Sequence, residues 1–261
     1  MDGGGVKDVS SEIRAAALEY VSPNGPRRVV RRPKTDVVAQ EQKVPYRNGH
    51  LSVRSWGDGE SVLLVHGWAA NQTDMFSYVP PFLENGIKVI AMDLPSHGES
   101  SGEYAGLDRL AEGILAVGAH FGALRGVVAH SAGCAAAQLA ISNGLVLDKA
   151  VMLASPINYE INAYRYAKAR DYNEEQTQLF IQALADLDVR VAIRSVDFVP
   201  AFRLPALIVH CEDDAVIPVS MGEELSKFWT GSQLFKVNGL KHRGVLKDES
   251  VISRVVSFVI E

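Results

Sequence analysis

Short, nearly continuous apolar runs alternate with stretches of helical periodicity along most of this chain, and no other feature constrains its fold as strongly. Runs such as SVLLVHG (61–67) and ALIVHCE (206–212) are typical of strands that are buried on both faces of a parallel sheet. Apolar residues recur at helical spacing in GLDRLAEGILAVGAHFG (106–122) and in DESVISRVVSFVIE (248–261). Because strands that alternate with helices form right-handed crossovers, the pattern predicts an α/β fold with a doubly wound, mostly parallel sheet.

The pattern predicts about eight strands in this sheet. The first two, at 36–46 and 50–56, alternate apolar with polar residues or are interrupted by charge, as antiparallel edge strands are. The others are expected at 61–67, 88–95, 125–131, 149–155, 206–212 and 232–237. Residues 156–205 are long for a crossover, and they hold four of the eight tyrosines and three of the nine phenylalanines. This segment is predicted to be a helical cap inserted after the sixth strand.

Residues 1–35 differ from the rest of the chain because glycine, proline and charged residues are frequent there. We interpret this segment as a solvated N-terminal arm, which leaves residues 36–261 as one α/β domain that carries the cap. The arm contains the basic cluster RRVVRRPK (27–34), a composition also found in nucleic-acid and membrane-surface patches. Blocks of like charge are commonly solvated tails, and we favour that interpretation here.

The composition argues against several classes of protein. The net charge of −5 gives no electrostatic reason to expect a nucleic-acid partner. No window approaches the apolar run of about 18 residues that a membrane span needs, and the N-terminus lacks the apolar core of a signal peptide. The chain is therefore expected to be cytoplasmic, without a membrane partner. Its two cysteines, Cys134 and Cys211, lack the spacing of a disulfide framework or a zinc site, so no metal is expected.

The stretch GVVAHSAGCAAAQ (126–138) joins a predicted strand to a predicted helix at Ser131. A serine nucleophile must project clear of the sheet, and an abrupt strand-to-helix turn makes it do so. Such a turn requires small residues two positions before and after the serine, where this chain has Ala129 and Gly133. The motif is a nucleophile elbow of the form A-x-S-x-G. Taken alone, the same stretch is equally typical of a serine N-cap on an ordinary helix.

Residues in two later loops could activate this serine. His242 in NGLKHRG follows the last predicted strand, where a general base is needed, and Asp214 in CEDDAVIP follows the strand before it. The carboxyl ends of parallel strands lie at one edge of a sheet, so the loops that follow them can meet. The chain order Ser131, Asp214, His242 is that of a nucleophile–acid–base triad on a doubly wound sheet. The choice of Asp214 over Asp213 rests on its spacing from the following apolar residues.

An oxyanion needs two backbone N–H donors, which we assign to Ala132 and Trp68. Ala132 follows the nucleophile at a helix N-terminus, and Trp68 lies in the loop HGWAAN after the third strand. His66 and His97 are expected to order their own loops by hydrogen bonds. His130 precedes the serine, and because neighbouring strand residues point to opposite faces, it is not expected to be the base.

A tentative substrate pocket is assigned to His130 together with two cap residues, Tyr159 and Tyr164. The alternative for each aromatic residue of the cap is that it forms part of the cap's own core.

The motifs HGW, DLPSHGES, AHSAG, HCEDDAVIP and GLKHRG occur in this order from about residue 48 to the end, and in this the chain resembles the α/β-hydrolase superfamily. Within it, the chain is similar to serine esterases and lipases, including uncharacterised bacterial esterases with an HGW oxyanion loop. The resemblance implies a triad of Ser131, His242 and Asp214, no cofactor, and carboxylic-ester substrates. Ala129 departs from the family pattern, which has glycine there.

We therefore expect a serine hydrolase, specifically a carboxylesterase that cleaves short- to medium-chain esters through an acyl-enzyme. A thioesterase, a C–C hydrolase or a perhydrolase would use the same triad. A non-catalytic small-molecule receptor on the same fold is the alternative from another class. A serine nucleophile argues against dehalogenase and epoxide hydrolase chemistry, in which a carboxylate stands at this position. The expected partner is a small-molecule ester, and the oligomeric state is left open.

Overall fold

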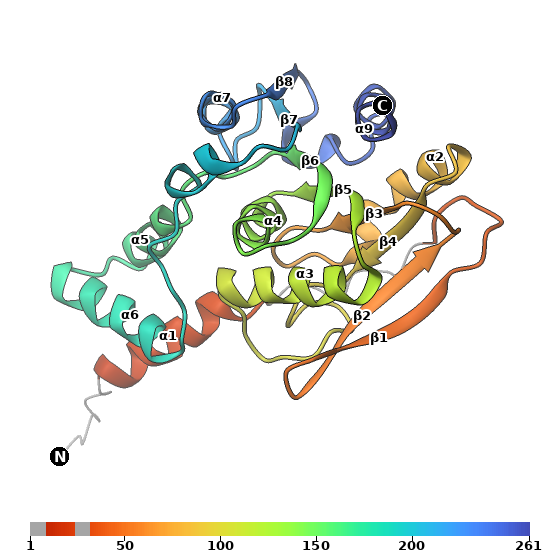
Figure 1. The fold of residues 1–261 in the computed structure, drawn as a ribbon. Coiled ribbons are helices and arrows are strands. Elements are labelled where there is room, and N and C mark those ends of the chain that lie inside the picture. The colour runs from red at the N-terminus through yellow and green to blue at the C-terminus, as the bar shows by residue number, and fades with distance from the viewer. Residues whose placement is uncertain (1–8, 24–31) are drawn as a thin grey trace, which may run out of the picture.

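The computed structural model describes residues 9–23 and 32–261 and contains one eight-stranded sheet in the order β1-β2-β4-β3-β5-β6-β7-β8 (Figure 1). The β1–β2 and β2–β4 pairs are antiparallel, and all other pairs are parallel. The predicted doubly wound, mostly parallel α/β sheet is therefore confirmed. The strands are β1 (Gln40–Tyr46), β2 (Gly49–Trp56), β3 (Ser61–Val65), β4 (Lys88–Met92), β5 (Leu124–His130), β6 (Leu147–Leu153), β7 (Ala206–Cys211) and β8 (Ser232–Val237).

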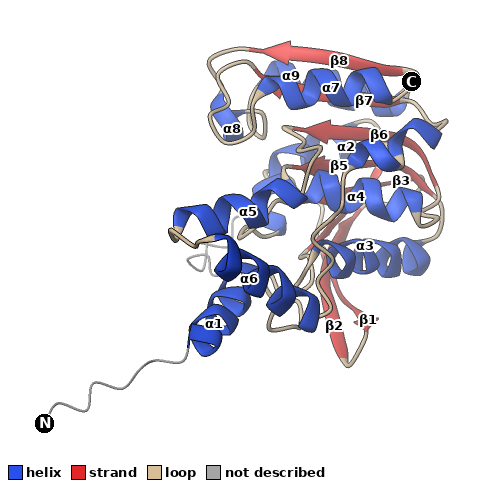
Figure 2. Ribbon diagram, turned by 90° about the vertical axis from the view of Figure 1, so that its left-hand side faces the viewer, coloured by secondary structure: helices blue, strands red, loops and turns tan. Residues whose placement is uncertain are grey.

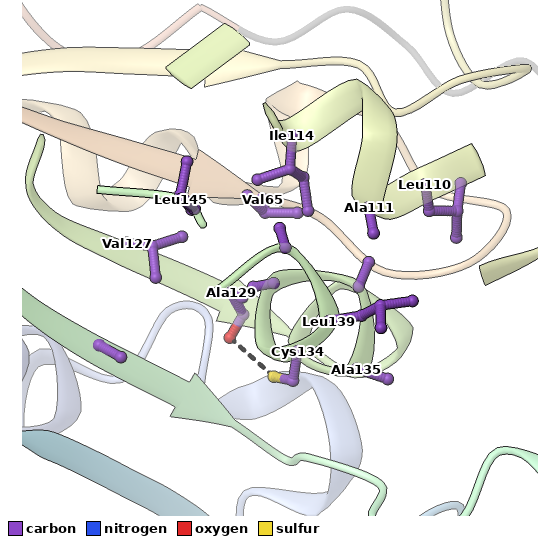
Figure 3. Packing of buried hydrophobic residues seen from close by; sticks show 14 of the residues in the cluster. Val65, Leu110, Ala111, Ile114, Val127, Ala129, Cys134, Ala135, Leu139 and Leu145 are labelled. Carbon is purple, nitrogen blue, oxygen red and sulfur yellow. Dashed lines mark hydrogen bonds between the residues drawn. The ribbon is translucent and has the colours of Figure 1, made fainter. Parts of the chain in front are cut away.

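The central strands are buried on both faces, which explains their continuous apolar sequences. Along β3, alternate side chains belong to different core clusters: Val62 and Leu64 lie in one, and Leu63 and Val65 in the other. The second of these clusters also contains buried side chains of α3 (Leu107–Phe121) and α4 (Ala132–Ser142), some of which Figure 3 shows beside Val65. The other cluster contains side chains of the remaining helical layer. That layer comprises η1 (Gln72–Tyr78), α2 (Val79–Glu84) and α9 (Glu249–Ile260).

The segment between β6 and β7 is helical, as expected for an insertion after the sixth strand. Its α6 begins at a capping box, in which the side chain of Asn173 accepts from the N–H of Gln176 and the Gln176 side chain accepts from Asn173. The elements of the segment are α5 (Glu160–Ala169), α6 (Glu174–Asp186), η2 (Ser195–Asp197) and η3 (Val199–Ala201). Two further helices, α7 (Val219–Phe228) and α8 (Lys241–Gly244), flank β8 in sequence.

The N-terminal segment differs from the solvated arm expected at 1–35. Part of it forms helix α1 (Val9–Val21), which packs along α6, and Figure 2 shows α1, α5 and α6 grouped together. Its buried side chains recur at helical spacing: Ile13, Ala16, Ala17 and Val21. Residues 1–8 and 24–31, and with them most of the basic cluster at 27–34, lie outside the described residues. Within the described ranges, no helix combines the length and hydropathy of a membrane span.

Candidate active site

Ser131 lies at the turn from β5 into α4 and has a backbone conformation that residues other than glycine rarely adopt, with φ of 53° and ψ of −125°. Such a conformation costs about 1–3 kcal/mol and persists only where the surroundings enforce it. The N–H of Ser131 donates to the carbonyl of Leu153 at 2.9 Å, which ties the turn to the neighbouring strand. The half-buried serine is thereby projected from the edge of the sheet, as a nucleophile must be.

The small residues around Ser131 allow close packing on both sides of the turn. A Cβ atom on Gly133 would lie 2.3 Å from the carbonyl oxygen of His66, so only glycine fits there while α4 keeps its present approach. Ala129 is fully buried, and its methyl group fits within the core cluster (Figure 3). Its carbonyl accepts a hydrogen bond from the Cys134 thiol at 3.1 Å. Alanine in place of the usual glycine is therefore accommodated.

His242 lies within hydrogen-bonding distance of both Ser131 and Asp214. The His242 Nε2 atom is 3.0 Å from the Ser131 hydroxyl oxygen, and its Nδ1 atom is 2.7 Å from Asp214 Oδ2. His242 lies on α8, the short helix after β8, and Asp214 lies in the loop after β7. These distances allow a relay in which the carboxylate orients the imidazole and the imidazole accepts the serine proton.

Asp214 contacts His242, whereas the adjacent Asp213 points elsewhere. Burial acts to raise the pKa of Asp214, but hydrogen bonds from His242 and from the N–H groups of Ile217 and Val216 outweigh it and hold that pKa below its ordinary value. Asp213 Oδ1 accepts from the N–H groups of Gly239 and Lys241, so this carboxylate holds the loop that carries the histidine. The structure thus gives the two neighbouring carboxylates different contacts.

Trp68 and Ala132 both line the cavity into which Ser131 opens. Ala132 is the first residue of α4, where backbone N–H groups have no partner within the helix. A Cβ atom on Gly67 would lie 3.1 Å from the Cβ of Ser131, which shows how closely the HGW loop approaches the nucleophile. The two predicted oxyanion donors therefore come from segments that flank the serine on either side.

His66 and His97 hold the loops around the site in place. The N–H of Leu94 donates to His66 Nε2 at 3.0 Å, so the proton of His66 is on Nδ1, which donates to the carbonyl of Gly67 at 2.7 Å. His97 Nδ1 donates to the carbonyl of Pro95 at 2.8 Å, and its ring meets the Trp68 ring edge-on. Both contacts agree with the loop-ordering role that the sequence suggested.

The cavity at Ser131 has a volume of about 480 Å³, and only part of the predicted pocket lines it. Tyr159 lies in its wall, but Tyr164 faces solvent on α5. His130 is also absent from the wall, because it is buried beneath the site and its Nε2 donates to the backbone carbonyl of His242 at 3.0 Å. Tyr166, another aromatic residue of the cap, also lines the cavity, and the lining residues that the sequence analysis missed are Glu19, Tyr20, Ser22, Pro156, Asn162, Val216 and Ile217.

Two other features bear on what the protein could bind. A larger cavity, of about 770 Å³, lies between α2 and α9 and includes none of Ser131, Asp214 and His242 in its lining. Over the residues that the structure describes, His, Cys, Asp and Glu side chains form no group of three or more that could hold a metal ion. Of these two cavities, the smaller one is lined by Ser131.

Acid is expected to destabilise the protein through its buried histidines. Burial, reinforced by a neighbouring histidine in each case, lowers the pKa of His97 and of His130 from 6.5 to about 3. Between these pH values the unfolded chain binds more protons than the folded chain. The contribution of these two histidines to the free energy of unfolding is therefore fully present above pH 6.5 and is lost as the pH falls. For His130→Gln, the slope of unfolding free energy against pH should decrease by about 1.4 kcal/mol per unit. Denaturant unfolding at pH 6.5 to 4.5 measures this slope, and identical slopes would contradict the assignment.

Comparisons with known proteins bear on the family and the fold of this chain. A sequence model described as the alpha/beta hydrolase family matches residues 62–251. The bifunctional esterase/perhydrolase DCH of Acinetobacter calcoaceticus is 24% identical over 243 residues, a match that covers 72% of this chain and 88% of that protein. A serine hydrolase-like protein of Danio rerio is 40% identical over 65 residues, which are 24% of this chain and only 20% of that protein. An esterase structure from Pyrococcus furiosus has a TM-score of 0.72 at 19% identity, over 91% of this chain and 97% of that one.

Proposed function

The chain belongs to the alpha/beta hydrolase family, and on this premise we propose that it is a serine hydrolase, a carboxylesterase that cleaves short- to medium-chain acyl esters through an acyl-enzyme. One observation carries the proposal: Ser131, His242 and Asp214 form a continuous chain of contacts, with 3.0 Å from serine to histidine and 2.7 Å from histidine to aspartate. The cavity of about 480 Å³ at Ser131 has a suitable volume for a small-molecule ester.

In the proposed reaction, His242 Nε2 accepts the Ser131 proton as the serine oxygen attacks the ester carbonyl. The N–H groups of Trp68 and Ala132 stabilise the negative oxygen of the tetrahedral intermediate. When this intermediate collapses, the C–O bond to the alcohol breaks and His242 gives its proton to the leaving oxygen. Water then attacks the acyl-enzyme by the same route, with His242 again as base, and releases the acid and the free serine. Asp214 stays ionised and keeps the imidazole in the required tautomer.

Perhydrolysis is the second candidate, because this chain is similar over most of its length to the bifunctional esterase/perhydrolase DCH. In this reaction hydrogen peroxide replaces water as the attacking molecule, so the acyl-enzyme yields a peracid instead of an acid. Peracid formation from ethyl acetate and hydrogen peroxide, compared with acetic acid formation in the same sample, measures the partition. A partition no greater than that of a serine protease control would exclude this activity.

The proposed function is tested by covalent labelling and turnover together. A fluorophosphonate probe is expected to label the protein within minutes, with the adduct on Ser131 by mass spectrometry, because a general base makes that hydroxyl nucleophilic. A series of p-nitrophenyl esters from acetate to laurate should give the highest kcat/KM at short to medium chain length. The Ser131→Ala variant controls for labelling elsewhere. Absence of both labelling and turnover, with retained binding of a neutral ligand, would instead indicate a receptor.

A further inference from the structure

The cavity at Ser131 has a wall that does not come from the part of the chain matched by the family model. Residues 62–251 match that model, yet Glu19, Tyr20 and Ser22, which belong to or follow α1, line the cavity together with Ser131. An adjoining part of the wall comes from the helical insertion after β6, through Tyr159, Asn162 and Tyr166. The N-terminal helix is thus an additional component of the site.

Helix α1 is anchored firmly enough to serve as a wall. Its apolar face is buried in a small core of its own with α5 and α6, which includes Phe180 of α6. Tyr20 contacts that core edge-on, with its ring 5.0 Å from that of Tyr166 and 5.7 Å from that of Phe180. The Tyr166 hydroxyl donates to the carbonyl of Ala16 at 3.2 Å. At the end of the helix, the carbonyl of Val21 accepts from the N–H of Ala105 at 2.8 Å.

Two of the tyrosines that line this cavity have a hydroxyl without a partner among the residues that the structure describes. Among the described residues, the hydroxyls of Tyr20 and Tyr159 form no hydrogen bond, and neither is sealed from solvent. Burial raises the pKa of Tyr159 to about 12, and burial together with Tyr159 and Tyr166 raises the pKa of Tyr20. Both hydroxyls therefore stay protonated and neutral at working pH. Each can donate a hydrogen bond to a ligand atom inside the cavity.

The lining that the structure describes offers no positive charge to an acidic ligand. Glu19 is the only charged residue among the described residues of the wall, and it is already paired with Arg170 at 2.7 Å. A ligand carboxylate that entered would lose its hydration without gaining a cation, which is unfavourable. A neutral ligand with a hydrogen-bond acceptor, such as an ether or carbonyl oxygen, would instead satisfy the free tyrosine hydroxyls.

We propose that α1 forms one wall of the acyl pocket, that Tyr20 is a specificity-determining residue, and that the pocket selects uncharged acyl groups with a hydrogen-bond acceptor along the chain. The cavity is assigned to the acyl group because this group stays attached to Ser131 between the two half-reactions, whereas the alcohol must leave. The proposal rests on the proposed esterase function and extends it to a class of substrate.

The test compares three p-nitrophenyl esters of equal chain length: hexanoate, 4-methoxybutanoate and the half-ester of adipic acid. In the unaltered protein, the adipate half-ester should react with a kcat/KM at least about tenfold below that of hexanoate. Tyr20→Phe, which keeps the ring packing, should lower the ratio of kcat/KM for 4-methoxybutanoate over hexanoate by about fivefold. Leu18→Ala is the matched control, because Leu18 lies on the exposed face of the same helix, outside the cavity lining.

A binding measurement separates this inference from the proposed function. Calorimetry on Ser131→Ala protein, alone and combined with Tyr20→Phe or Leu18→Ala, compares N-phenylhexanamide with N-phenyl-4-methoxybutanamide. If no ester is hydrolysed but the preference in binding still depends on Tyr20, the pocket is assigned as proposed and the esterase function is not. If Tyr20→Phe behaves like Leu18→Ala in both measurements, or if the adipate half-ester reacts as fast as hexanoate, the inference is overturned.

Discussion

Replacing His242 with alanine is expected to lower kcat for ester hydrolysis by about four to six orders of magnitude. The reason is the 3.0 Å contact between His242 Nε2 and the Ser131 hydroxyl: without the imidazole, no positioned group accepts the serine proton or protonates the leaving alcohol. The fold should survive, because the contact that His130 makes to this residue uses its backbone carbonyl, which alanine retains. Initial rates with p-nitrophenyl butyrate measure the loss, and circular dichroism measures the fold.

The matched control for this experiment is His120→Ala. His120 is exposed in the last turn of α3, and its ring contacts the side chain of Gln42 on the neighbouring β1. Its removal should leave kcat essentially unchanged, so any general effect of losing a histidine would show in both variants. Similar rates for His242→Ala and the unaltered protein would refute the assignment of the general base.

Replacing Asp214 with asparagine is expected to lower kcat by about 10⁴-fold. Asp214 Oδ2 lies 2.7 Å from His242 Nδ1 and accepts a hydrogen bond from the N–H there, which leaves Nε2 free to accept the proton of Ser131. An asparagine can present an N–H to Nδ1 and so favour the wrong tautomer. Because hydrogen bonds keep the pKa of Asp214 low despite burial, the loss should persist across the neutral and alkaline range. A pH–rate profile of the variant measures this.

The adjacent carboxylate provides a sharp comparison, since Asp213→Asn makes the same chemical change one residue away. Asp213 Oδ1 accepts hydrogen bonds from backbone N–H groups of the His242 loop, and an asparagine carbonyl oxygen can accept them too. Its kcat should fall by no more than about tenfold. If Asp213→Asn were the more damaging of the two, the roles given to these aspartates would have to be exchanged.

The triad was accessible to sequence reasoning because each of its members follows a predicted strand. Parallel strands that end at one edge of a sheet bring their following loops together, so order along the chain is enough to predict that Ser131, Asp214 and His242 meet. His130 marks the limit of this reasoning. Alternation along a strand indicated that it points away from Ser131, but only the packed structure shows that its ring lies under α8 and bonds the backbone of His242.

The substrate pocket was less predictable. Tyr159 and Tyr164 are equally aromatic and lie close together in the sequence, yet only Tyr159 faces the cavity, because Tyr164 is on the solvent side of α5. The sequence of the N-terminal helix has a helical pattern that we overlooked, because the glycine, proline and charge content of residues 1–35 suggested a solvated arm. Its buried residues, Ile13, Ala16, Ala17 and Val21, recur at helical spacing, which could have indicated a helix with one packed face.

Local patterns in the sequence predict the order of the elements, the sheet and the reacting groups. Continuous apolar runs indicate strands that are buried on both faces, and small residues around Ser131 indicate a turn that projects the serine. These patterns depend on neighbours in the sequence and can be recognised there. Which side chains surround the substrate depends on contacts between segments far apart in the chain. Tyr20 contacts Tyr166 because α1 packs against the helical insertion. For the same reason, both tyrosines line the cavity that contains Ser131. That packing is a property of complementary surfaces in three dimensions, and only the tertiary structure shows it.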